Sequence, residues 1–150
     1  MTLPLNDVTV FASSSYRNLA IGIAGELDGN IGDIDTRRFP DGETYHRLLT
    51  RPDGKHCVLV GGTISDSETL EIYDLAFGLV THGARRLTMV IPFLGYSTME
   101  RAVKRGEVVK AKTRARLLSA IPIAAEGNRA VLLDVHSEGL PYYFEGSLNA

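Results

Sequence analysis

The stretch CVLVGG, Cys57 to Gly62, is decisive for the fold class of this chain. Its apolar residues form a near-continuous run that ends at two glycines, as expected for a strand in a parallel sheet covered on both faces. Similar runs occur at Leu87–Ile91 (LTMVI) and Ala130–Leu133 (AVLL), and VTVF at Val8–Phe11 precedes them. These runs predict the central strands of one sheet.

Longer stretches between these runs have helical spacing. Apolar residues recur at this spacing from Leu19 to Leu27, within Asp66–His82 before Gly83, and within Lys110–Ser119. Ser13-Ser14-Ser15 offers hydroxyls that could cap the first of these helices. The alternation of strand and helix predicts an α/β fold with a doubly wound, mostly parallel sheet.

Two further strands are predicted at Ile34–Phe39 and Thr44–Leu48, on either side of the turn signal Pro40-Asp41-Gly42. The charged segment Arg101–Gly106 is predicted to be a loop.

The composition limits the function classes. The 150 residues are one ordinary domain's worth, with 44% hydrophobic and 23% charged residues. A net charge of −2 gives no basic field for nucleic acid, and no apolar run approaches the roughly 20 residues of a membrane span. The lone Cys57 is expected to be a small core residue, and the N-terminus lacks a secretory n-region. These features favour a cytoplasmic protein that binds neither nucleic acid nor membrane.

In open α/β sheets, ligands bind beyond the carboxyl ends of the strands. This rule directs attention to the segments that follow predicted strands. They are Ala12–Ser15, Phe39–Tyr45, Gly61–Ser67, Pro92–Glu107 and Asp134–Gly139.

Two of these segments are rich in ligand-type residues. In Arg37–Tyr45, Phe39 could stack on a base, and Asp41 and Glu43 could accept hydrogen bonds from an exocyclic amine. Local physics favours a plain Pro-Asp-Gly turn with two solvated arginines. Arg101, Lys104 and Arg105 suit phosphate groups. A solvated charged loop is the alternative reading of those three residues.

Asp134-Val135-His136-Ser137 follows directly on an apolar run. A histidine at a strand end can bind a metal–phosphate complex or act as an acid or base, whereas a core histidine bonded to backbone fits the local pattern equally well. Mg²⁺ fits better than zinc, because one histidine and one aspartate do not make a tetrahedral site. No GxxxxGK[ST] or GxSxG motif is present, which argues against P-loop kinases and triad hydrolases.

Taken together, these segments resemble ribose-phosphate pyrophosphokinases. The resemblance covers nearly the whole chain and is carried by FASSSYRNLA (Phe11–Ala20), RRFPDGETY (Arg37–Tyr45), ARRLTMVIPFLGYSTMER (Ala84–Arg101) and LLDVHSEGLPYYFE (Leu132–Glu145). It implies a three-layer, phosphoribosyltransferase-like N-terminal domain over residues 1–150, with the second, C-terminal family domain absent from this chain.

The resemblance also implies a site. FPDGE looks like the family's adenine-binding loop, contributed to the ATP site of a neighbouring subunit in a homo-oligomer (dimer or hexamer). The loop after PFLGY resembles the segment that binds ATP phosphates, and the histidine of DVHS corresponds to the catalytic residue at the Mg²⁺–ATP site. The implied residues are Phe39, Asp41, Glu43, Glu100, Arg101 and Lys104 for ATP, and His136 for catalysis and metal.

The implied activity is transfer of pyrophosphate from ATP to ribose 5-phosphate, giving phosphoribosyl pyrophosphate and AMP for nucleotide biosynthesis. The isolated chain is expected to be inactive. Thr98, Met99 and Glu100 stand where the family usually shows Arg-Gln-Asp, and GGTISDSETLEIYD is a loose match. The Thr98-Met99 replacement favours one alternative, a catalytically silent, regulatory homologue. A further alternative is an enzyme of the same fold that accepts a related ribose phosphate or nucleotide, which only the second family domain would distinguish.

Overall fold

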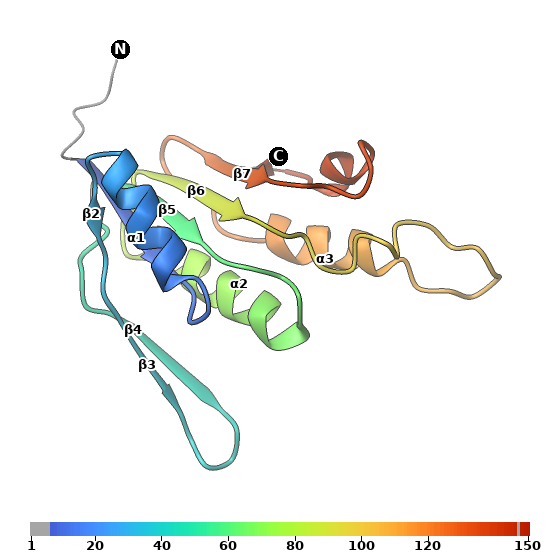
Figure 1. The fold of residues 1–150 in the computed structure, drawn as a ribbon, viewed down its shortest axis with the longest axis horizontal. Coiled ribbons are helices and arrows are strands. Elements are labelled where there is room, and N and C mark those ends of the chain that lie inside the picture. The colour runs from blue at the N-terminus through green and yellow to red at the C-terminus, as the bar shows by residue number, and fades with distance from the viewer. Residues whose placement is uncertain (1–6, 147) are drawn as a thin grey trace.

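A computed structural model describes residues 7–146 and 148–150. Figure 1 shows the arrangement of the elements. The strands are β1 (Val8–Ala12), β2 (Asn30–Ile31), β3 (Ile34–Arg38), β4 (Thr44–Leu48), β5 (His56–Val60), β6 (Arg86–Ile91), β7 (Asn128–Leu132) and β8 (Leu148–Asn149). The helices are α1 (Arg17–Glu26), α2 (Asp66–Thr81), α3 (Lys110–Ser119) and the short 3₁₀ helix η2 (Leu140–Tyr143). Within the described ranges, no helix is both long and apolar enough to cross a membrane.

The main sheet has the strand order β2-β1-β5-β6-β7-β8, and all its neighbouring strands run parallel. The order reverses at β1, because β2 lies on one side of it and β5 on the other. The predicted doubly wound, mostly parallel α/β sheet is confirmed.

The sheet is covered on both faces, which makes the domain three-layered (Figure 1). Successive residues of β5 point to opposite faces: Leu59 belongs to the core beneath α2 and α3, whereas Val58 packs in a second core beneath α1. Cys57 is fully buried, and burial raises the pKa of its thiol to about 12. Its predicted role as a small core residue is confirmed.

The strands β3 and β4 form an antiparallel hairpin of their own outside the main sheet. Their predicted bounds agree with the structure to within one residue. The expectation that Phe39–Tyr45 lies at the carboxyl edge of the main sheet is wrong, because this segment is the turn of the hairpin, which extends away from the sheet in Figure 1. The edge strands β2 and β8 were not predicted, since two-residue strands carry no periodic signal.

The expected capping of α1 by the serines at 13–15 is also wrong. The N-cap is Tyr16, which makes no side-chain hydrogen bond, and the backbone N–H and hydroxyl of Ser14 instead donate to Glu71 of α2. The helix α2 does have a side-chain cap, because the Ser65 hydroxyl accepts from the backbone N–H of Glu68 at 3.2 Å.

Replacing Ser65 with alanine should lower the free energy of unfolding by about 1 kcal/mol, the typical value of an N-cap hydroxyl. Ser15→Ala is the matched control, because Ser15 is an exposed serine that caps no helix. Urea denaturation of both variants checks this, and equal unfolding midpoints would contradict the assigned cap.

Candidate functional site

The loops after β5 and β6 are in direct contact at the carboxyl edge of the sheet. The backbone N–H of Gly95 donates to the Thr63 hydroxyl at 2.9 Å, and Thr63 is fully buried. A Cβ atom at Gly95 would lie 1.9 Å from the Thr63 carbonyl oxygen, so only glycine fits this crossing. The segment that follows β6 is therefore fixed against the segment that follows β5.

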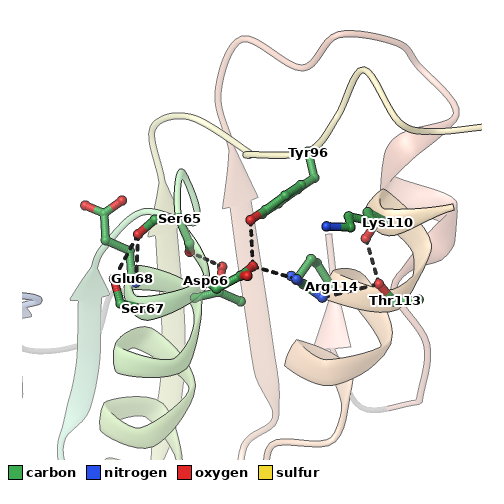
Figure 2. A network of polar contacts seen from close by, with 9 residues as sticks. Ser65, Asp66, Ser67, Glu68, Tyr96, Lys110, Thr113 and Arg114 are labelled. Carbon is green, nitrogen blue, oxygen red and sulfur yellow. Dashed lines mark hydrogen bonds and ion pairs between the residues drawn. The ribbon is translucent and has the colours of Figure 1, made fainter. Parts of the chain in front are cut away.

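Tyr96, the next residue, lies at the centre of a polar network (Figure 2). Its hydroxyl donates to Asp66 Oδ1 at 2.6 Å, and Arg114 Nη2 contacts the same oxygen at 2.6 Å. The Arg114 guanidinium carbon and the Lys110 ammonium lie 4.8 and 5.2 Å from the centre of the Tyr96 ring. The network joins the first turn of α2 to the first turns of α3.

The charges of this network perturb its titratable groups. Hydrogen bonds from Tyr96 and then Arg114 hold the pKa of Asp66 below its ordinary value, because both donors stabilise the carboxylate. The hydrogen bond to Asp66 raises the pKa of Tyr96, and the bond to Asp66 also raises the pKa of Arg114. Asp66 therefore stays ionised and Tyr96 and Arg114 stay protonated near neutral pH.

The charged loop of residues 97–109 is attached to the turn that follows β7. The Glu100 carboxylate accepts a hydrogen bond from the Ser137 hydroxyl, and the Tyr143 hydroxyl donates to the Glu100 carbonyl. Glu107 folds the loop back on itself by accepting from the backbone N–H groups of Val103 and Lys104 at 2.7 and 3.0 Å, and these bonds lower its pKa.

His136 lies in the turn that Glu100 contacts. Asp134 adopts a left-handed conformation (φ 51°), and Val135 packs against the main core. His136 is exposed, and its ring makes no hydrogen bond within residues 7–146 and 148–150. The alternative of a core histidine bonded to backbone is wrong.

The tip of the β3–β4 hairpin presents Phe39, Asp41 and Glu43 to solvent. The tip is a tight turn, in which the Phe39 N–H donates to the Glu43 carbonyl at 2.8 Å and the Glu43 N–H donates to Asp41 Oδ1 at 3.0 Å. Figure 1 shows the tip and the 97–109 loop extending from the sheet in different directions. One chain therefore brings His136 and the charged loop together but leaves the hairpin tip apart from them.

Comparison with known proteins adds to this geometry. Residues 8–121 match the family model of the N-terminal domain of ribose phosphate pyrophosphokinase. The chain belongs to this family. A ribose-phosphate pyrophosphokinase of Methanothermobacter thermautotrophicus is 32% identical over 90% of this chain and 46% of its own length. A chloroplastic ribose-phosphate pyrophosphokinase 2 of Oryza sativa is 31% identical over 91% of this chain and 34% of its own length.

The fold is similar to that of a family member of known structure. The phosphoribosylpyrophosphate synthetase of Mycobacterium smegmatis superposes with a TM-score of 0.80 at 23% identity, over 96% of this chain and 48% of that protein. The predicted three-layer α/β fold is thus that of a phosphoribosylpyrophosphate synthetase. The chain spans about half the length, or less, of these two curated relatives.

The sequence prediction missed three residues of the polar network: Asp66, Lys110 and Arg114. Lys110 and Arg114 are four residues apart, so a helix places them on one face, but nothing in the spacing indicates that this face meets Tyr96. In the described residues, Arg101 and Lys104 are exposed and make no ion pair, which leaves their charges available to a ligand.

The described residues hold no group of three or more His, Cys, Asp or Glu side chains that could bind a metal. His136 and Asp134 are both exposed. This suits a Mg²⁺ ion, which takes most of its ligands from water and phosphate oxygens. A hollow of about 440 Å³ lies between the hairpin and α2, but none of the implied ATP or catalytic residues lines it.

Replacing Gly95 with alanine should lower the free energy of unfolding by about 1–3 kcal/mol, because the added methyl group must displace the Thr63 backbone. Gly25→Ala in α1 is the control, since nothing lies within 4 Å of its added Cβ, and it should stabilise slightly. Urea denaturation distinguishes the two, and a neutral Gly95→Ala would show that the crossing of the two loops is not as close as described.

Proposed function

We propose that this chain is the ATP-binding half of a ribose-phosphate pyrophosphokinase. The enzyme would transfer pyrophosphate from ATP to ribose 5-phosphate to give phosphoribosyl pyrophosphate and AMP for nucleotide biosynthesis. The observation that carries the proposal is the attachment of the cationic 97–109 loop, through Glu100 and Ser137, to the turn that exposes His136. Because the chain spans about half of its relatives, the ribose 5-phosphate side of the site is assigned to the remainder of the enzyme.

The reaction requires positioning and charge neutralisation rather than a covalent intermediate. The 1-hydroxyl oxygen of ribose 5-phosphate bonds to the β-phosphorus of ATP, the bond from that phosphorus to the AMP oxygen breaks, and the hydroxyl proton is released. Arg101 and Lys104 would contact the phosphate oxygens of ATP, and Glu100, whose carboxylate accepts from the Ser137 hydroxyl, would hold the loop beside them. Mg²⁺ bound with ATP supplies charge neutralisation, and His136 is its proposed protein ligand.

The hairpin tip supports a site shared between subunits. Phe39 is 46% exposed, and its ring meets only the edge of Tyr45, with 6.5 Å between ring centres. Since the tip extends away from its own charged loop, Phe39, Asp41 and Glu43 are proposed to hold the adenine at the site of a neighbouring copy (Figure 1). The proposal therefore includes a homo-oligomer, either a dimer or a hexamer. A cytoplasmic location is proposed as well.

A second candidate is a catalytically silent partner of an active enzyme. Thr98 is exposed and uncharged where the family usually has arginine, so a charge-assisted phosphate contact is missing. Such a contact is worth about 1.5–3 kcal/mol, which corresponds to a loss of roughly tens-fold in ATP affinity. If the oligomeric chain joined to its second domain shows no Mg–ATP binding by calorimetry, this second candidate replaces the first.

His136→Ala should abolish most turnover while leaving the unfolding midpoint unchanged, because the ring is exposed. The assay is AMP release that depends on ribose 5-phosphate, in protein joined to the second family domain. His82→Ala, an exposed histidine at the end of α2, should retain activity. AMP release by the 150-residue chain alone would contradict the proposed division between the two halves.

Phe39→Ala should weaken Mg–ATP binding by about two- to tenfold, since aromatic stacking adds about 0.5–1.5 kcal/mol beyond buried area. Phe77→Ala is the matched control, because Phe77 has a similar exposed fraction (42% against 46%) but lies on α2. Titration calorimetry of the oligomer checks both variants. An ATP affinity equal to that of the control would remove Phe39 from the site.

A further inference from the structure

Few side-chain bonds hold the loop of residues 97–109 in one conformation: those of Glu107 within the loop and that of Glu100 to Ser137. Nearly all of its residues from Thr98 to Val108 are exposed, and it includes the cations Arg101, Lys104 and Arg105. Ordering a backbone costs conformational entropy for each residue fixed, and an exposed loop buries too little surface to offset this. Contacts at its ends therefore add to the bonds of Glu100 and Glu107 in placing its charges.

Both ends of the loop meet in one cluster. Tyr96 immediately precedes the loop and Lys110 immediately follows it, and the Lys110 ammonium lies 5.2 Å from the centre of the Tyr96 ring. Figure 2 shows Arg114 reaching from α3 to the oxygen of Asp66 that also accepts the Tyr96 hydroxyl. Because Lys110 and Arg114 share one face of α3, a single aromatic ring contacts both.

The backbone at the start of the loop needs this support. Tyr96 has φ 62°, a left-handed conformation that is uncommon for a bulky residue and persists only where the surroundings hold it. Its hydroxyl and its ring are both engaged, the first by Asp66 and the second by the two cations. In addition, the preceding residue, Gly95, lies directly against the Thr63 backbone.

We propose that Asp66, Tyr96, Lys110 and Arg114 form a positioning cluster that closes the ends of the 97–109 loop and so orients Arg101 and Lys104 toward the phosphates of ATP. This inference rests on the proposed function for its ligand, but the closure of the loop can be measured without ATP. The four side chains act through the loop and do not themselves contact the reacting atoms.

Tyr96→Phe is the decisive variant, because it keeps the ring above which the cations lie and removes the hydroxyl with its bond to Asp66. Trypsin cleaves after Arg101, Lys104 and Arg105, so the rate of cleavage in the loop, followed by mass spectrometry, reports how often it opens. We expect about tenfold to a hundredfold faster cleavage in Tyr96→Phe, the range for loss of a hydrogen bond to a charged group. Tyr142→Phe, which alters a tyrosine that is 85% exposed, should leave the rate unchanged.

Cleavage after Arg86, which lies within β6, separates loop opening from global unfolding. It should stay equally slow in wild type and Tyr96→Phe, and a parallel rise at Arg86 and in the loop would overturn the proposal. Equal loop cleavage in wild type and Tyr96→Phe would also overturn it. Arg114→Lys, which keeps the charge and shortens the reach to Asp66, should fall between wild type and Arg114→Met.

Mg–ATP provides the second arm of the experiment, on protein joined to the second family domain. A positioning role predicts that Tyr96→Phe needs about tenfold more Mg–ATP for half-protection of the loop but reaches the same protection at saturation. Failure to converge at saturation would show damage to the structure rather than lost positioning, and would overturn the inference. If Mg–ATP protects neither protein while the cleavage rates still differ without it, loop closure stands and the proposed function fails.

Discussion

The structure depends on the burial of β1, β5 and β6 on both of their faces. Val10, Leu59 and Leu87 are fully buried, and the cores beneath α1 and beneath α2 and α3 use alternate residues of the same strands. Parallel strands require crossover connections, so the segments that leave their carboxyl ends collect at one edge of the sheet. That edge holds Thr63, Tyr96 and His136, although they are far apart in sequence.

Charge at this edge is arranged around one carboxylate. Asp66 is the first residue of α2, where a negative charge is favoured by the helix dipole, and the same carboxylate pairs with Arg114. The start of α3 has the opposite character, because it has no acidic residue in its first turn and begins with Lys110. The two helix starts therefore complement each other across Tyr96, and Asp66 both begins a helix and anchors a loop.

The β3–β4 hairpin is stabilised in a different way from the rest of the domain. An isolated two-stranded hairpin is marginally stable in water, and this one is attached mainly at its base, where the Asp33 N–H donates to the Thr50 hydroxyl at 2.9 Å and Leu48 packs against the main core. Its tip is shaped by its own turn bonds, so it can keep its form while extending from the domain. This suits the proposed role of presenting Phe39 to another copy of the chain.

The sequence by itself determined the fold class, the central strands, the three long helices and the exposed nature of the charged loop. Apolar runs and helical spacing are local signals, and the burial they predict is what the structure shows for Cys57 and Leu59. The resemblance in FPDGE, PFLGY and DVHS also led to the family. Only the tertiary structure decided that the hairpin lies outside the sheet, that His136 is exposed, and that Asp66, Lys110 and Arg114 meet at Tyr96. These outcomes depend on how packed elements approach one another, and a one-dimensional pattern carries the period of an element but not the identity of its neighbour.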